Sequence, residues 1–178
     1  SAHRAMEADA SALIVVPHVG ELSLAVRLRR EFGDGSVVEL HGGLSAGKLR
    51  AAWLRILAGP SIVIGTRPAV MAPSMAIGAI VILESDSPDL RQYDQNPRYD
   101  AREIARFRGD ACGADVIFAR HAPRIEEHAL VKERGWTYHE PEITEARTTI
   151  MSAGPGNIDP ISSVADAAES ALQEGKKV

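Results

Sequence analysis

Short runs of apolar residues, each bounded by turn-forming residues, recur at fairly even intervals along the chain. Each run has the length and composition of a strand that lies inside a sheet covered on both sides. The runs cover residues 12–16, 37–40, 62–65, 79–83 and 115–119. The pattern therefore predicts five strands, each buried on both faces.

Segments with a helical spacing of apolar residues separate these predicted strands. They cover residues 22–31, 45–57, 101–113 and 124–134. Strands that alternate with helices imply right-handed crossover connections and strands that run in the same direction. We predict an α/β fold in which helices flank a mainly parallel sheet.

Two of the predicted helices carry more specific expectations. Between residues 22 and 32, Arg27, Arg29 and Arg30 lie largely opposite the apolar residues, which predicts a solvated basic face. In the next helix, Ser45 is placed to cap the first turn. Trp53 follows the helical spacing of that segment, so we expect it in the core rather than on the surface as a stacking platform.

The pattern weakens after Pro141. Residues 148–151 predict one more strand, and the glycines and prolines between 151 and 160 are typical of a linker. A serine cap and an alanine-rich helix over about residues 164–173 follow. We therefore divide the chain into a domain over residues 1–150, a linker over 151–160 and a helical segment over 161–178.

The composition is that of an ordinary globular protein, with 45% apolar and 25% charged residues among 178. No stretch approaches the roughly 20 apolar residues that cross a bilayer, so we expect a cytoplasmic protein with no membrane partner. The single cysteine, Cys112, excludes an internal disulfide and a zinc site of several cysteines. The histidines are dispersed, and we predict no structural metal.

The formal net charge of −4 argues against a free-standing domain that binds nucleic acid mainly by neutralising phosphates. Local basic patches are compatible with this charge. Of the 20 basic residues 16 are arginines, whose planar guanidinium suits bidentate contacts with phosphate.

A glycine-rich turn precedes the helix that contains Trp53. Gly42, Gly47 and Lys48 match the spacing G-x-x-x-x-G-K of a phosphate-binding loop that follows a strand and enters a helix. Leu49 stands where such a loop has a serine or threonine for magnesium, and an apolar side chain cannot bind a hard cation. A turn that caps a helix is favoured, and a small nucleotide-binding loop at these residues is kept as an alternative.

Four longer runs carry a family resemblance. They are VPHV at residues 16–19, HGGLS at 41–45, IVIGTRPAVMAP at 62–73 and NPRYDAR at 96–102. Their order and sequence resemble the primosomal protein N-prime (PriA) family of superfamily-two helicases, whose runs read like VPEI, HSGLS, GTRSAxFAP and GPRYHAR. The resemblance covers about residues 13–134.

The resemblance implies a three-layer RecA-like (P-loop NTPase-like) fold over residues 1–150. This part would be the first helicase lobe without its Walker A loop, and residues 161–178 would be the helix that opens the second lobe. Family members are ATP-dependent DNA helicases of replication restart, recombination and repair, and active members use ATP and magnesium. The implied partners are forked or single-stranded DNA, bound weakly, and other primosome or replication proteins.

The chain departs from the family at the catalytic boxes. The family's Asp-Glu-Glu-His box aligns with Glu84, Ser85, Asp86 and Ser87, in which Ser85 replaces the carboxylate that polarises the attacking water. The family's Ser-Ala-Thr-Pro appears as RHAP at residues 120–123. We expect no catalytic residues, no cofactor in this chain and no ATP hydrolysis, as in actinobacterial members with degenerate boxes, which the run at residues 84–90 resembles.

The resemblance also assigns a DNA-contacting surface. It places Thr66 and Arg67 at the carboxyl edge of the lobe, which contacts the phosphate backbone of the tracked DNA strand. A hydroxyl and a guanidinium there can bind phosphate without reading the base sequence. Arg98 and Arg102 lie four residues apart and are candidates for the same groove, with an internal ion pair as the alternative. A module that only docks replication proteins is the remaining alternative for the whole domain.

Overall fold

The computed structural model describes residues 2–94, 96–120 and 125–137. The predicted strand at residues 148–151, the linker at 151–160 and the helix at 161–178 all lie outside the described residues. In the part of the chain that is described, no helix has the length and apolar character to cross a membrane.

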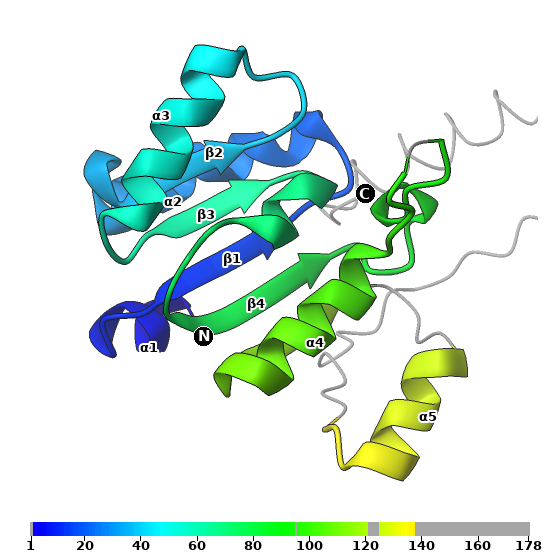
Figure 1. Ribbon diagram of the computed structural model, residues 1–178. Helices are drawn as coiled ribbons and strands as arrows, with labels where there is room; N and C mark the ends of the chain where they lie inside the picture. Colours follow the sequence, from blue (N-terminus) through cyan, green and yellow to red (C-terminus); the bar gives the residue numbers. More distant parts are fainter. Residues whose placement is uncertain (1, 95, 121–124, 138–178) are drawn as a thin grey trace, which may run out of the picture. The chain divides into compact units, whose positions relative to one another are not determined.

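Five parallel strands form the sheet at the centre of the domain (Figure 1). Their order is β2-β3-β1-β4-β5, so the first strand of the chain lies in the middle of the sheet. The predicted strands and the parallel sheet are therefore confirmed. The strands are β1 (Ser11–Val15), β2 (Val37–Leu40), β3 (Ile62–Gly65), β4 (Ile77–Leu83) and β5 (Asp115–Ala119).

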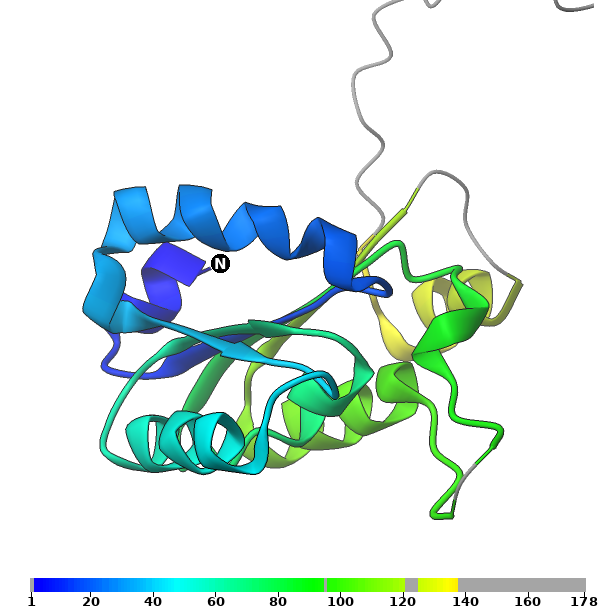
Figure 2. The same ribbon diagram turned by 90° about the horizontal axis from the view of Figure 1, so that it is seen from above.

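Helices cover both faces of this sheet (Figure 2). One face is covered by α1 (Ala2–Glu7) and α2 (Leu24–Phe32), and the opposite face by α3 (Ala46–Leu57) and α4 (Ala101–Cys112). A further helix, α5 (Ile125–Arg134), follows β5. Short 3-10 turns complete the domain: η1 (Val19–Ser23), η2 (Asp34–Ser36), η3 (Arg67–Met71) and η4 (Pro88–Leu90).

Burial explains why the central strands have no polar face. Every residue of β1 and β3 is buried, as expected for parallel strands that have helices on both sides. Side chains such as Leu13 and Ile80 point into one core with α3 and α4, whereas Ile14 and Ile64 point into the other with α1 and α2. The domain thus has one core on each side of the sheet.

Local chemistry sets the ends of the helices. Ser45 caps α3, because its hydroxyl accepts a hydrogen bond from the Lys48 amide at 3.4 Å, and this predicted cap is confirmed. Asp100 caps α4 by accepting from the Arg102 amide at 3.0 Å. Gly113 ends α4 with a left-handed φ of 67°, a conformation that favours glycine.

Two expectations about burial are wrong. Trp53 is 45% exposed rather than in the core, because α3 covers the edge strand β2 and only Ile56 of this helix is buried. Strand β5 was expected to be buried on both faces, but Asp115 and Ile117 are exposed. The physical reason is its position at the other edge of the described sheet, where a strand has one neighbour instead of two.

Candidate nucleic-acid interface at the carboxyl edge

The segments that follow the strands meet at one edge of the sheet, because all five strands run in the same direction. Thr66 and Arg67 follow β3, Glu84 to Ser87 follow β4, and Arg120 follows β5. The described structure therefore brings two of the four predicted DNA-contact residues, Thr66 and Arg67, to the same edge as the four positions that the sequence comparison aligns with the family's Asp-Glu-Glu-His box.

A tight turn holds the four box positions. The turn begins at Glu84 with a left-handed φ of 44°, and the Ser87 amide donates to the Glu84 carbonyl at 2.8 Å. Ser85 is fully buried, and its amide donates to the Ala119 carbonyl at 3.1 Å. The Ser85 side chain is thus buried within the turn, while Glu84 and Asp86 are exposed to solvent.

The carboxylates around this turn do not form a metal site among the described residues, where no three His, Cys, Asp or Glu side chains are grouped for a cation. Glu21, in η1, lies close enough to this turn for the charge of Glu84 to affect its pKa. Burial and the nearby charge of Glu84 raise the pKa of Glu21 above its ordinary value, although His18 opposes the change. Two acidic side chains thus repel one another at this edge.

Arg102 fastens the turn to the start of α4. Its guanidinium donates from Nη1 to the Ser85 carbonyl at 2.8 Å and to the Ser87 carbonyl at 3.3 Å. Its Nε and Nη2 atoms donate to the two carboxylate oxygens of Asp100 at 2.7 and 2.6 Å. Arg102 is only 8% exposed. The internal ion pair, rather than a place on an exposed DNA surface, is therefore what the structure shows for this residue.

The ion pair also makes stability depend on pH. Burial tends to raise the pKa of Asp100, but the hydrogen bonds and charge of Arg102, with the charge of Arg91, hold that pKa below its ordinary value of 3.8. Because the folded pKa is the lower one, the stabilisation is complete above the unfolded pKa and is lost as pH falls through the folded pKa.

We expect Asp100→Asn to reduce the free energy of unfolding at neutral pH and to matter progressively less below about pH 4. Urea unfolding of both proteins across a pH series measures this difference. A difference that stayed constant down to about pH 2 would contradict the assignment of the pH dependence to Asp100.

Arg67 is partly engaged inside the domain. Its Nη1 atom donates to the Asp89 carbonyl at 3.2 Å and to the Arg91 carbonyl at 2.9 Å. Its guanidinium carbon also lies 5.8 Å from the centre of the Tyr99 ring. Arg67 therefore holds the segment after η4 against the start of η3 and is only half-buried itself. Thr66, also half-buried, accepts a hydrogen bond at its carbonyl from the Ala69 amide at 2.7 Å.

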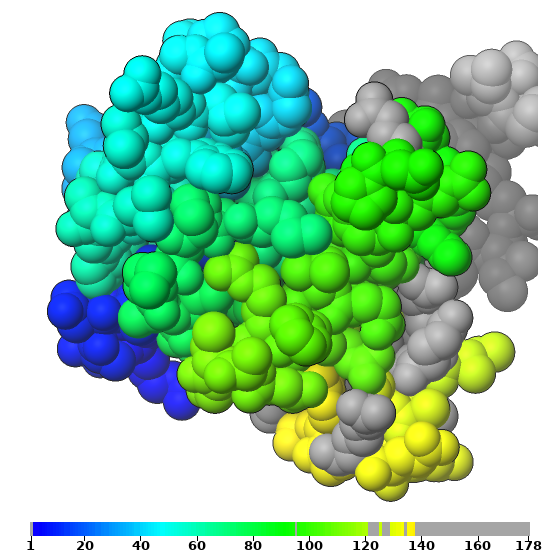
Figure 3. Space-filling model, viewed as in Figure 1, coloured from blue at the N-terminus to red at the C-terminus, as the bar shows by residue number. Residues whose placement is uncertain are grey.

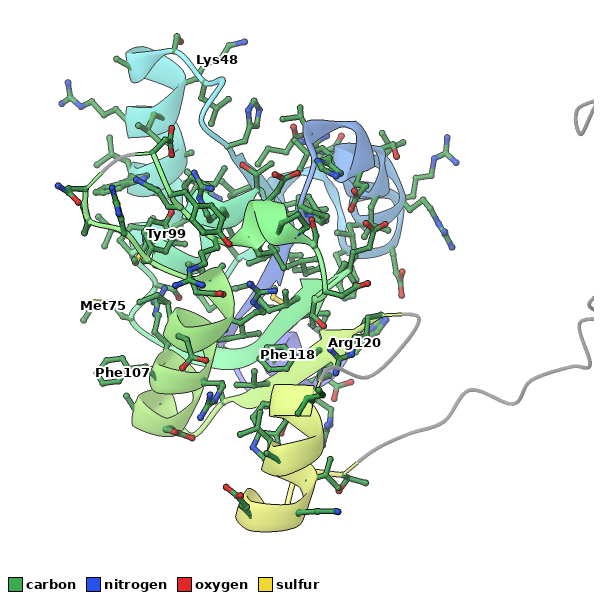
Figure 4. The ribbon with its side chains drawn as sticks, turned by 90° about the vertical axis from the view of Figure 1, so that its right-hand side faces the viewer. Lys48, Met75, Tyr99, Phe107, Phe118 and Arg120 are labelled. Carbon is green, nitrogen blue, oxygen red and sulfur yellow. The ribbon has the colours of Figure 1, made fainter. Side chains whose placement is uncertain are left out.

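A cavity of about 390 Å³ lies between this segment and the start of α4. Four arginines and two tyrosines line it, together with apolar side chains that include Phe118 and Leu130; the arginines are Arg91, Arg98, Arg102 and Arg106, and the tyrosines are Tyr93 and Tyr99. Tyr99 and Phe118 are marked in Figure 4. The cavity is therefore rich in cations and rings, although the chain as a whole is acidic.

The four arginines divide into two pairs. Arg102 is neutralised by Asp100, and Arg106 donates to Glu103 at 3.1 Å. In contrast, Arg91 and Arg98 have no carboxylate within ion-pairing distance among the described residues. The guanidinium of Arg91 lies 5.3 Å from the centre of the Tyr93 ring, and Tyr93 is 59% exposed.

Of the residues predicted from the sequence to contact DNA, Arg98 and Arg102 line this cavity, and Arg91 and Tyr93, which also line it, were not among them. Both missed residues lie in a segment without regular periodicity, which returns to α4 through a single antiparallel bridge between Arg91 and Asp100. The signal that could have found them is the pairing of a basic and an aromatic residue two positions apart in a loop at a carboxyl edge.

The glycine-rich turn before α3 is closed on itself. The Gly43 amide donates to His41 Nδ1 at 3.2 Å, and the Leu44 amide donates to the His41 carbonyl at 3.2 Å. The Lys48 amide is taken by the Ser45 cap, and the Lys48 side chain points away from the domain (Figure 4). Three amides of this turn, those of Gly43, Leu44 and Lys48, are therefore bonded within it, which supports a helix-capping turn.

A five-stranded parallel sheet with helices on both faces and its candidate site at the carboxyl edge defines an α/β domain of the RecA-like class. No family model matches the chain. The chain is 34% identical over 118 residues to the replication restart protein PriA of Synechocystis, which covers 65% of this chain and 14% of that protein.

Other relatives have the same name. The replication restart protein PriA of Bacillus subtilis is 30% identical over 124 residues, which are 68% of this chain and 15% of the relative. The protein named probable replication restart protein PriA in Mycobacterium leprae is 31% identical over 157 residues, which are 87% of this chain and 23% of the relative. The chain belongs to the PriA family and spans less than a third of the length of these relatives.

Proposed function

We propose that this chain acts in the restart of DNA replication as a part of a PriA-type protein that holds DNA without hydrolysing ATP. The observation that supports this proposal best is the cavity in which Arg91 and Arg98 have no carboxylate partner among the described residues. The family relationship supplies the process, because the relatives carry the name of replication restart proteins.

The chemistry of the cavity suits a nucleic-acid strand better than a small neutral ligand. Guanidinium groups bind phosphate oxygens through two parallel hydrogen bonds, and such contacts position a strand without reading its sequence. Tyr93 adds an exposed ring beside Arg91, and a ring of this kind can stack on any base. Two phosphate contacts on a chain of net charge −4 predict weak, salt-sensitive binding.

The turn at residues 84–87 is the reason that the proposed function includes no ATP hydrolysis. Phosphoryl transfer requires a group that orients the attacking water and a metal that neutralises the developing charge. Ser85 supplies a buried hydroxyl instead of a carboxylate, and its turn is fixed by Arg102. In the turn at residues 42–48 the amides of Gly43, Leu44 and Lys48 are bonded internally, so these three are not available to hold the phosphates of a nucleotide.

The double variant Arg91→Ala/Arg98→Ala is expected to weaken binding of a labelled single-stranded oligonucleotide, because it removes the two unpaired cations of the cavity. Fluorescence anisotropy over a range of salt concentrations measures the effect. The slope of log affinity against log salt should become shallower by about 0.7 for each lost phosphate contact.

The matched control is Arg27→Ala, which removes an exposed cation on α2, on the opposite face of the sheet. It should leave affinity and slope nearly unchanged. Equal affinity of the double variant and the unaltered protein would show that the cavity does not bind the oligonucleotide.

The same samples test for ATP hydrolysis. Phosphate release from MgATP should stay at the buffer background, and turnover that Lys48→Ala abolished would restore the nucleotide-loop alternative.

A further inference from the structure

The outer side of α3 is an apolar surface that the domain leaves exposed. Leu49, Trp53 and Leu57 follow one another at four-residue intervals, so they form one row along the helix, here named the α3 stripe. All three are exposed, whereas Ile56 on the inner side is 2% exposed. The helix therefore has an apolar surface wider than the sheet beneath it can cover.

Other elements of the domain also carry exposed apolar residues. On the same face of the sheet, η3 and the segment after it carry Met71 and Met75, and α4 carries Phe107. Met75 is 87% exposed and Phe107 is 72% exposed, and both project from the same side of the domain (Figure 4). Figure 3 shows this face, with α3 in cyan above the green segment and α4.

This surface is held rigidly from below. Arg108 of α4 donates to the Val70 carbonyl of η3 at 2.5 Å, and burial lowers the pKa of Arg108. Ile56, Val70 and Ala105 pack in one core beneath the three elements. A partner would thus meet a preformed surface, which reduces the entropy cost of binding.

The charges of α3 define the complementary partner. Lys48, Arg50 and Arg55 are the charged residues of this helix, and all three are basic in a chain of net charge −4. Arg55 donates to the Gly35 carbonyl at 2.6 Å and is engaged within the domain. Arg50, next to Leu49 and exposed, forms no hydrogen bond or ion pair with another described residue.

We propose that the α3 stripe, with Arg50 at its border, is a docking site for an acidic amphipathic helix of a partner protein. Apolar side chains of that helix would cover Trp53 and Leu57, and its carboxylates would pair with Arg50 and Lys48. A protein segment fits better than nucleic acid, because a base could stack on Trp53 but a nucleic-acid strand offers no aliphatic side chains to cover the two leucines. The stripe shares no residue with the arginine cavity.

The test uses the whole chain and a designed probe. The probe is a fluorescein-labelled peptide about four turns long, with leucines on one helical face and glutamates elsewhere. Its control has lysine in place of every glutamate. In a Trp136→Phe background Trp53 is the only tryptophan, so its emission reports directly on burial of the stripe.

The glutamate peptide is expected to bind, to shift Trp53 emission to shorter wavelength and to bind more tightly than the lysine peptide. Trp53→Ala and Arg50→Glu should each weaken binding by about tenfold or more, as at the centre of an interface. The matched controls are Val26→Ala and Arg27→Glu, exposed changes of the same kind on α2, which should leave the affinity unchanged. Circular dichroism verifies that each variant is folded.

Three results would overturn the proposal. One is peptide affinity that Trp53→Ala and Arg50→Glu do not change, and another is displacement of the peptide by an oligonucleotide, which would make the stripe a nucleic-acid surface. The third is self-association of the chain alone, seen by sedimentation and lost in Trp53→Ala, which would assign the stripe to a second copy.

Discussion

Replacement of Gly65 by alanine is expected to lower the free energy of unfolding by about 4 kcal/mol or more, because the sheet has no room for a methyl group at this position. A Cβ atom there would lie 1.7 Å from the Leu40 carbonyl oxygen and 2.9 Å from the Ala69 Cβ atom. Leu40 is paired with Gly65 between β2 and β3, so relief requires the backbone of two strands to separate. Urea unfolding followed by circular dichroism measures the loss.

Gly47→Ala provides the matched control for this change. Gly47 lies in α3, and nothing stands within 4 Å of the added Cβ atom. Alanine has the higher helix propensity, so the same chemical substitution should here raise stability by up to about 1 kcal/mol. Equal effects of the two alanines would show that the close approach of β2 at Gly65 is not the cause.

Arg102→Ala is expected to destabilise the domain by about 3–5 kcal/mol, the usual cost of removing one partner from a buried ion pair. The substitution leaves the Asp100 carboxylate and the carbonyls of Ser85 and Ser87 without the guanidinium. The urea midpoint should therefore fall sharply. Because the turn at residues 84–87 depends on these bonds, we also expect its amides to become more accessible to solvent.

The control for Arg102 is Arg98→Ala, which removes an exposed arginine from the same cavity. Arg98 has no ion pair among the described residues, so its removal should change stability by less than about 0.5 kcal/mol. The two substitutions therefore separate stability from DNA binding. A loss of about 1 kcal/mol or less in Arg102→Ala would contradict the structural role assigned to this side chain.

The strands were predictable because a strand that is buried on both faces consists of consecutive apolar residues, which can be read directly from the sequence. The exposure of Trp53 and Ile117 could not be predicted in this way, because an apolar residue lies in the core or on the surface depending on whether another element covers it. Helical spacing identifies the apolar side of α3, but the width of sheet available beneath that side is a property of the fold.

The candidate site was predictable only in part for similar reasons. Arg98 and Arg102 are four residues apart, which suggests one helical face, but α4 begins at Ala101, so the two arginines do not share a helix. Asp100, which caps α4 between them, accepts hydrogen bonds from Arg102 and holds its side chain inside the domain. Arg91 and Tyr93 join the cavity through a bridge between strand-like segments, and the spacing of a basic and an aromatic residue two positions apart does not by itself indicate such a contact.

The central place of β1 in the sheet has a consequence for synthesis of the chain. The five buried residues of β1 are synthesised before both neighbouring strands, because Ala12 pairs with Ile62 and Val15 with Ile82. Until β3 and β4 have been made, this buried strand has no neighbour on either edge, and long loops must close to bring its partners. The nascent chain therefore carries an unpaired, aggregation-prone segment until β4 has been synthesised, and we expect this segment to be a target of chaperones.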